Sequence, residues 1–235
     1  MSSPTQVIKC IGPKLVPFFK SVSVYFVLLA EQPSVLTAVL KCLPIMSLIF
    51  FVLLHGISLS KEYTFSRRIL IGLIFSCIGD AFLVWPNCFT AGMCMFAVAQ
   101  IMYIIAFGFE RLSLTLGALL YTFCAVVIYI LMPGLKGVLA IGVPIYTILI
   151  TTMAWRAISR VQFSGELTWT KLCSCIGSIC FVISDTLLGF HHFHTKLPYA
   201  QVSIMLTYYA AQLGIALSAV DSKNNSNNRV PASKG

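Results

Sequence analysis

An aspartate inside a membrane-length apolar segment is the feature of this sequence that most restricts its fold. The segment Arg67–Trp85, RRILIGLIFSCIGDAFLVW, begins with two arginines and continues as a mainly apolar run that contains Asp80. A second segment of this kind, Lys171–Phe190, contains Asp185. A carboxylate at the centre of a membrane helix costs about 2.5–3.5 kcal/mol on insertion scales. The two segments therefore predict a polytopic membrane protein in which the carboxyls meet inside a helical bundle.

The composition excludes a soluble domain. Of 235 residues, 58% are hydrophobic and only 10% are charged, which leaves too few polar residues to cover a soluble core. The net charge of +9 is spread over loops and not gathered in a patch, so no nucleic-acid partner is expected. The nine cysteines include no CxxC pair, which argues against a zinc site or a disulfide framework.

Apolar runs of about 20 residues, each long enough to cross the hydrocarbon core as a helix, predict an all-α bundle of about eight transmembrane helices. The bundle is expected to occupy residues 1–220, followed by a polar cytosolic tail, 221–235, predicted to be disordered. The predicted helices are Pro13–Ala30, Ser34–Leu59, Arg68–Trp85, Phe89–Phe109, Leu112–Met132, Leu135–Trp155, Trp169–Phe190 and Tyr199–Val220.

The basic residues predict the orientation of these helices. Only Lys136 and Lys196 fall in loops on the face opposite the termini. The terminal face carries Lys9, Lys14, Lys61, Arg67, Arg68, Arg111, Arg156, Arg160, Lys171, Lys223, Arg229 and Lys234. Because loops rich in Lys and Arg stay in the cytosol, both termini are expected there. Glycosylation of Asn224, in the tail sequon NNS, in a membrane-inserted preparation would contradict this orientation.

An offset of 105 residues relates the third and fourth predicted helices to the seventh and eighth. It aligns Asp80 with Asp185, Gly72 with Gly177, and Tyr103 with Tyr208. In so apolar a chain several such matches arise by chance, so the offset suggests a four-plus-four duplication without establishing one.

Asp80 and Asp185 are the candidate catalytic residues. They lie 12 and 14 residues from the cytosolic helix starts at Arg68 and Lys171, which corresponds to depths of about 18 and 21 Å at 1.5 Å per residue. Two intramembrane acids at one depth indicate a functional pair. The alternative is that each aspartate is isolated and satisfied by a neighbouring serine or lysine.

Further polar residues in apolar segments are candidates for substrate binding. Lys41 could pair with an aspartate, receive a lipid phosphate or extend its amine to the interface. Gln100 and Tyr103 share a helix face, as do Tyr208 and Gln212. These four side chains could line a polar cavity, or they could form hydrogen bonds between helices that hold the bundle together.

Three histidines, His191, His192 and His194, follow Asp185 at the end of its helix, with His192 two turns along the same face. No further carboxylate or cysteine is spaced to complete a coordination shell, so no metal site is predicted.

Four motifs, by their order and spacing, resemble the YhhN-like lysoplasmalogenases of bacteria and animals, and the resemblance covers nearly the whole chain. The motifs are Lys41-Cys-Leu-Pro44, Gly72-Leu-Ile-Phe-Ser-Cys-Ile-Gly-Asp80, Phe181-Val-Ile-Ser-Asp185 and Tyr208-Tyr-Ala-Ala-Gln212. The opening Gly12–Lys20 looks like the animal members. One position departs from the pattern, since a histidine often precedes the tyrosine of the fourth helix by three residues and this chain has Gln100 there.

The resemblance implies hydrolysis of the vinyl ether bond of a lysoplasmalogen with an ethanolamine or choline headgroup, in the endoplasmic reticulum membrane and without a cofactor. The products would be a fatty aldehyde and glycerophosphoethanolamine or glycerophosphocholine. A vinyl ether is cleaved by protonation of its β-carbon, and water then attacks the oxocarbenium-like cation. One protonated carboxyl and one carboxylate suit this chemistry, and two neighbouring carboxyls in a low-dielectric site cannot both ionise easily. Asp80 and Asp185 are the candidates for these roles.

Two other classes of protein use paired acids in a membrane. A proton-coupled transporter would move its substrate without releasing an aldehyde. An intramembrane aspartyl protease would also carry two aspartates on helices. Such proteases share the dipeptide Gly79-Asp80, but Cys77 stands where they have a glycine, and no Pro-Ala-Leu motif follows Asp185.

Overall fold

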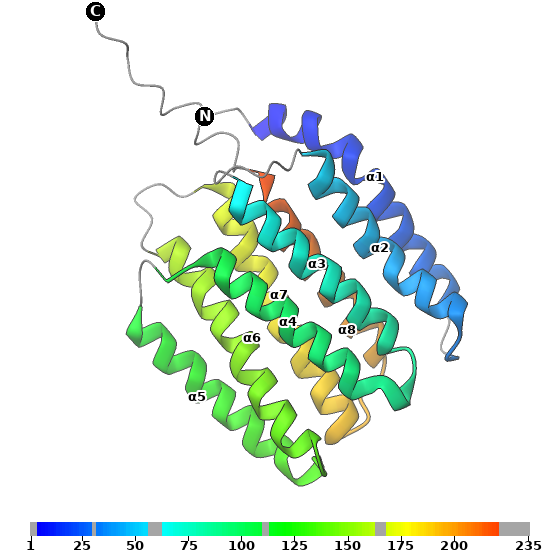
Figure 1. Cartoon of the computed structure of the whole chain (residues 1–235), viewed down its shortest axis with the longest axis vertical. Coiled ribbons are helices and arrows are strands. Elements are labelled where there is room, and N and C mark those ends of the chain that lie inside the picture. The colour runs from blue at the N-terminus through cyan, green and yellow to red at the C-terminus, as the bar shows by residue number, and fades with distance from the viewer. Residues whose placement is uncertain (1–3, 30–31, 56–62, 110–112, 163–167, 221–235) are drawn as a thin grey trace, which may run out of the picture.

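The computed structural model of the protein describes residues 4–29, 32–55, 63–109, 113–162 and 168–220. Within these ranges the chain forms eight α-helices and no strand (Figure 1), so the predicted all-α fold is confirmed. The helices are α1 (Pro4–Leu28), α2 (Val35–Leu54), α3 (Thr64–Phe82), α4 (Phe89–Phe107), α5 (Leu114–Leu131), α6 (Leu139–Gln162), α7 (Trp169–Phe193) and α8 (Ala200–Leu217). Short 3-10 turns, η2 (Pro86–Cys88) and η3 (Met132–Gly134), precede α4 and follow α5.

Helix α1 begins earlier than predicted, at Pro4 instead of Pro13. Pro13 and Pro17 both lie inside the helix. Proline removes one backbone donor and favours a helix start, which is why the sequence suggested a boundary there. Membrane helices accommodate internal prolines because neighbouring groups satisfy the freed carbonyls. The predicted end of the second helix, Leu59, lies outside the described residues.

Helix α6 is displaced from its predicted span, Leu135–Trp155. It begins at Leu139, because the turn η3 and the left-handed conformation of Gly137 (φ 56°) interrupt the chain before it. It then continues past Trp155 to Gln162. The Trp155 indole therefore lies within the helix, where Nε1 donates a hydrogen bond to the Ser113 carbonyl at 2.8 Å. An aromatic residue that was expected to mark a helix end instead joins α6 to the start of α5.

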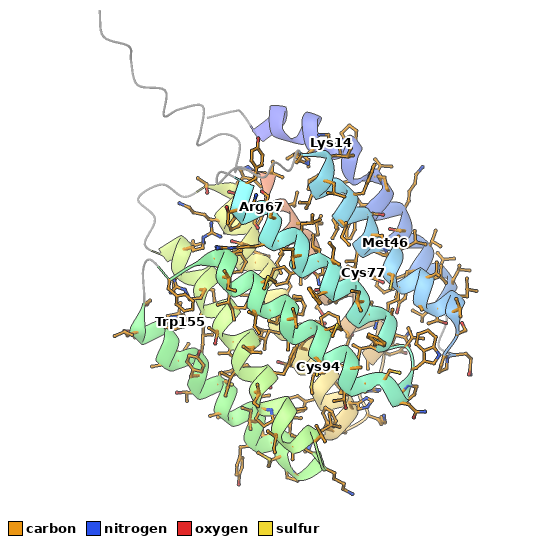
Figure 2. The ribbon with its side chains drawn as sticks, in the orientation of Figure 1. Lys14, Met46, Arg67, Cys77, Cys94 and Trp155 are labelled. Carbon is orange, nitrogen blue, oxygen red and sulfur yellow. The ribbon has the colours of Figure 1, made fainter. Side chains whose placement is uncertain are left out.

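Among the described residues, seven helices are long and apolar enough to cross a membrane. Helix α3 is the exception, and its 19 residues include Arg67, Arg68 and Asp80. Large apolar side chains are exposed, such as Ile141 on α6. Met46 on α2 is another, on the outside of the bundle (Figure 2). An apolar exterior around a packed interior is the arrangement of an integral membrane protein.

The first turn of α1 and the last turn of α8 lie at the same end of the bundle (Figure 1). The turn η2 and the α7–α8 connection lie at the opposite end. Both ends of the described chain therefore lie on one face, as predicted. The assignment of that face to the cytosol stays a prediction.

Helices α7 and α8 approach each other closely through two glycines. A Cβ added to Gly177 would lie 2.8 Å from the Ala211 carbonyl oxygen, and one added to Gly214 would lie 2.7 Å from the Cys173 carbonyl oxygen. Small residues at such positions allow membrane helices to pack backbone against backbone. This contact fixes α7, which carries Asp185, against α8, which carries Tyr208.

The helix contacts follow the same order in the two halves of the chain. Helices α1–α2, α2–α3 and α3–α4 pack as neighbours, and so do α5–α6, α6–α7 and α7–α8. The halves meet through α2 against α8 and α4 against α6. This order is the one a four-plus-four duplication would produce. It places the α2–α3 pair and the α6–α7 pair in equivalent positions.

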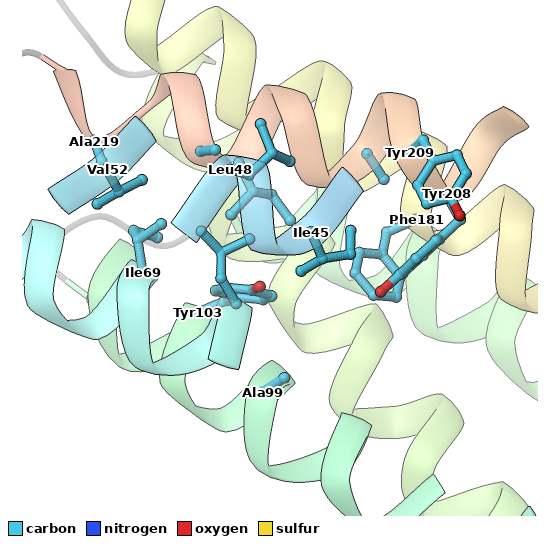
Figure 3. Packing of buried hydrophobic residues seen from close by; sticks show 14 of the residues in the cluster. Ile45, Leu48, Val52, Ile69, Ala99, Tyr103, Phe181, Tyr208, Tyr209 and Ala219 are labelled. Carbon is cyan, nitrogen blue, oxygen red and sulfur yellow. The ribbon is translucent and has the colours of Figure 1, made fainter. Parts of the chain in front are cut away.

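The main hydrophobic core lies among α2, α3, α4, α7 and α8 (Figure 3), and α1 and α6 also contribute side chains to it. Its fully buried side chains include Ile45 and Leu48 of α2, Tyr103 of α4 and Phe181 of α7. A smaller cluster, which includes Val127 and Val143, joins α5 to α6. The space between these two cores contains the candidate site.

Candidate functional site

A cavity of about 200 Å³ lies among α4, α5, α6, α7 and α8, and α2 and α3 each contribute to its wall. Most of the wall is apolar and includes Phe96, Val127, Ile150 and Met205. Ionisable side chains are few among the described residues that line it. They are Lys41, Asp80, Cys124, Tyr146, Asp185, His192 and Tyr208. The two aspartates, 105 residues apart in sequence, thus reach one cavity from α3 and α7.

Asp80 is 1% exposed and is held by two side chains, one on each carboxyl oxygen. The Lys41 ammonium of α2 lies 3.5 Å from Oδ1. The Tyr208 hydroxyl of α8 donates a 2.5 Å hydrogen bond to Oδ2. A cation and a hydroxyl donor both stabilise the ionised form of a carboxyl group, so these two partners oppose the cost of burying a charge at Asp80.

Asp185 has a different partner and is more accessible. Its side chain is partly exposed and lines the cavity, and the Tyr146 hydroxyl of α6 donates a hydrogen bond to Oδ2. Among the described residues no cation forms an ion pair with Asp185, whereas Lys41 does so with Asp80. Asp185 nevertheless lies within electrostatic reach of both Asp80 and Lys41. Ionising both carboxyls in this apolar cavity would therefore bring two like charges together.

Behind the cavity wall, a chain of hydrogen bonds holds Tyr208 in place. The Gln212 amide nitrogen donates to the Tyr208 hydroxyl at 3.2 Å, and the Tyr103 hydroxyl donates to the Gln212 amide oxygen at 3.1 Å. Ser76 lies 3.4 Å from the Tyr103 hydroxyl. These bonds join α3, α4 and α8, and they fix the hydroxyl that contacts Asp80.

Gln100 is fully buried on α4, but its amide nitrogen and oxygen form no hydrogen bond of ordinary geometry among the described residues. The amide does lie close enough to the Tyr146 hydroxyl to interact with it. Gln100 therefore lies next to the tyrosine whose hydroxyl contacts Asp185.

Of the five residues predicted to bind substrate, Lys41 and Tyr208 line the cavity, and Gln100, Tyr103 and Gln212 do not. Tyr103 and Gln212 instead form the hydrogen bonds between helices that were the alternative interpretation of these residues. Lys41 occupies the position of a counter-ion to Asp80.

Sequence reasoning missed Tyr146 and did not assign a role to His192 at this cavity. Tyr146 is one tyrosine in an apolar helix and carries no distinguishing mark, except that the 105-residue offset aligns it with Lys41. His192 lines the cavity and stacks on Phe89 with ring centroids 4.6 Å apart. No group of three or more His, Cys, Asp or Glu side chains in the described ranges is placed to hold a metal ion.

This arrangement can deliver a proton and stabilise a positive charge within an apolar cavity. A protonated Asp185 can donate, and a carboxylate at Asp80 can face a developing cation, as paired carboxyls do in glycosidases. The apolar wall can accommodate a hydrocarbon chain next to both groups.

Comparison with known proteins places these features in a family. The sequence model of the YhhN family matches residues 36–219. The chain is 43% identical over 228 residues to lysoplasmalogenase TMEM86A of Bos taurus, with 95% of each chain covered. It is 36% identical over 211 residues to human lysoplasmalogenase TMEM86B, with 88% of this chain and 87% of the relative covered. No solved structure matches the chain.

Proposed function

Because this chain belongs to the YhhN family, we propose that it is a lysoplasmalogenase, an enzyme that hydrolyses the vinyl ether bond of a 1-alkenyl lysophospholipid. The observation that carries the proposal is that Asp80 and Asp185 line one cavity whose wall is otherwise mainly apolar. Such a cavity suits a lipid with one hydrocarbon chain, and two carboxyls supply the acid and the negative charge that vinyl ether cleavage needs.

The partners of the aspartates support different roles for them. Asp80, between the Lys41 ammonium and the Tyr208 hydroxyl, is suited to remain a carboxylate and to face the oxocarbenium carbon. Asp185 has a neutral partner, and the hydrogen bond from Tyr146 occupies only Oδ2. Its other oxygen forms no hydrogen bond within the described residues, so it can carry a proton and deliver it to the β-carbon of the vinyl ether.

The reaction then balances with water as the only co-substrate. Asp185 transfers its proton to the β-carbon, which leaves an oxocarbenium ion next to the Asp80 carboxylate. A water oxygen bonds to the α-carbon, which carries the ether oxygen, and a proton from the water returns to the carboxylate pair. The resulting hemiacetal breaks its bond to the glycerol oxygen, which takes up the hydroxyl proton. The products are a fatty aldehyde and a glycerophospho-alcohol.

Among the other polar residues, Lys41 and Tyr208 are proposed to act at the cavity, as the side chains that hold Asp80. Tyr103 and Gln212 are proposed to support Tyr208. Gln100 is proposed to orient Tyr146 in this chain, where a histidine is often found in the family. The location in the endoplasmic reticulum membrane, with cytosolic termini, belongs to the same proposal.

The test is to incubate the purified protein with a 1-alkenyl lysophospholipid and to measure free fatty aldehyde. We expect aldehyde release from this lipid and little hydrolysis of the 1-acyl analogue, because the acid pair is suited to protonating a carbon and not to attacking an ester. Comparable rates on the two lipids would indicate a lysophospholipase. Uptake of lipid into proteoliposomes without aldehyde would indicate the proton-coupled transporter.

A further inference from the structure

Among the described residues that line the cavity, one side chain that can carry a positive charge has no part in the proposed chemistry. Of the residues that can carry a positive charge, Lys41 and His192 line the wall, and Lys41 is paired with Asp80. We propose that His192 binds the phosphate of the lysolipid, so that the glycerophosphate lies at the end of the bundle opposite the first turn of α1 and the last turn of α8. This inference rests on the proposed function, because it names the part of that substrate which His192 contacts.

The position of His192 along α7 fits the length of the substrate. It lies seven residues beyond Asp185 on the same helix face, a rise of about 10.5 Å at 1.5 Å per residue. In a 1-alkenyl lysophospholipid, seven bonds separate the vinyl β-carbon from phosphorus, or roughly 9 Å in an extended chain with bonds near 1.5 Å. A lipid whose β-carbon meets Asp185 can therefore bring its phosphate to the His192 ring.

The His192 ring is held in position but is free to bind. It stacks on Phe89 of α4 with an interplanar angle of 11°, and it contacts Phe193 edge-on. The side chain is exposed, and its nitrogens form no hydrogen bond within the described part of the chain. An oriented imidazole N–H is a good donor to a phosphate oxygen, in either protonation state of the ring.

The charges around His192 favour an anion. His191 and Lys196 lie close enough to act on it electrostatically. Asp80 and Asp185 are the only acidic side chains among the described residues, and both lie deeper in the bundle. A phosphate at Lys41 would instead compete with Asp80 for its counter-ion and bring two negative charges together. The cavity therefore separates the phosphate from the carboxyls.

The opposite side of the cavity fits the hydrocarbon chain. Phe123 of α5 lines the cavity and is also 50% exposed on the outside of the bundle. With the phosphate at His192 and the vinyl ether at Asp185, the chain continues along the apolar wall of α5 and α6, past Val127 and Ile150. The polar end of the lipid thus lies at the end of the bundle that holds η2 and the α7–α8 connection. Its apolar end points toward the surrounding hydrocarbon.

The experiment compares His192→Phe with a matched control, His194→Phe. Phenylalanine keeps the stack on Phe89 and removes both ring nitrogens. His194 contacts Phe190 edge-on and does not line the cavity. The substrates are 1-alkenyl lysophosphatidylcholine and 1-alkenylglycerol, which lacks the phosphate. We expect His192→Phe to raise KM for the phospholipid about tenfold with little change in kcat, the loss of one hydrogen bond to a charged group.

The same variant should leave turnover of 1-alkenylglycerol unchanged. The control, His194→Phe, should leave the kinetics on both substrates unchanged. If His192→Phe raised KM equally for both substrates, or left KM for the phospholipid unchanged, the phosphate site would be overturned.

A binding measurement separates this inference from the proposed function. The saturated 1-alkyl lysophosphatidylcholine has no vinyl ether to hydrolyse, and its binding to the full chain in nanodiscs should weaken about tenfold in His192→Phe. If that weakening occurs and no aldehyde is ever released from the alkenyl lipid, the phosphate site stands and the proposed function fails. If aldehyde is released and binding is unchanged, the phosphate site is wrong and the proposed function stands.

Discussion

At the scale of single residues, the two aspartates differ most in the side chain that contacts each from the preceding helix. The 105-residue offset that relates Asp80 to Asp185 also relates Lys41 to Tyr146, and each of these residues contacts its aspartate. One of the two positions related by this offset thus carries a cation and the other a neutral hydroxyl. This difference is what allows two equivalent acids to take unequal roles.

Substitution of these two partners should affect kcat more than KM. Lys41→Met removes the cation that stabilises Asp80 as a carboxylate, and we expect kcat to fall about 10–100-fold, as for a lost bond to a charged group. Tyr146→Phe frees the Asp185 carboxyl to rotate, and we expect a fall of about tenfold. Steady-state kinetics of aldehyde release measures both.

The control for Tyr146→Phe is Tyr121→Phe, which removes a hydroxyl that contacts Thr152 at 2.7 Å outside the cavity. It should leave kcat unchanged. A rise in KM alone for Lys41→Met would instead assign Lys41 to the substrate phosphate, and equal losses in Tyr146→Phe and Tyr121→Phe would reduce Tyr146 to a packing role.

At the scale of helices, the close packing of α7 on α8 positions Asp185 relative to Tyr208. Gly177→Ala places a methyl group 2.8 Å from the Ala211 carbonyl oxygen, so the helices must separate. We expect a loss of about 1–3 kcal/mol of stability, typical of overpacking, and a lower activity per folded molecule. Thermal denaturation in detergent measures the stability, and aldehyde release measures the activity.

The control is Gly12→Ala, where no atom lies within 4 Å of the added Cβ. This change should be neutral or stabilising. Equal melting temperatures for the two variants would contradict this packing.

Sequence patterns predicted the helices better than their ends. Membrane-length apolar runs reveal spans because each must satisfy its own backbone in hydrocarbon. The ends of α1 and α6 were missed because proline at Pro13 and tryptophan at Trp155 are typical of boundaries, but here both are internal. The position of Trp155 is set by its hydrogen bond to the Ser113 carbonyl, 42 residues away, which a local sequence pattern cannot reveal.

At the scale of the whole molecule, the sequence predicted that two carboxyls would meet, because an intramembrane acid needs a partner. It could not predict which neutral residue completes the site. Tyr146 is set against Asp185 by the packing of α6 on α7, a contact between helices that leaves no periodic signal in either one. The roles of Gln212 and Tyr103 could be narrowed to two alternatives from their spacing, and the arrangement of α3, α4 and α8 favours the structural one.

The central claim is that Asp80 and Asp185 act as one unit, and turnover by their asparagine variants tests it most directly. Asparagine keeps the volume of each side chain but can neither donate an acid proton nor carry a charge. Turnover of a 1-alkenyl lysophospholipid is measured for Asp80→Asn, Asp185→Asn and the double variant, normalised to folded protein in detergent. Each single variant should lose about 10²–10⁴-fold or more, and the double variant should be scarcely worse, because groups that act together are strongly non-additive. Near-normal turnover in either single variant would contradict the claim.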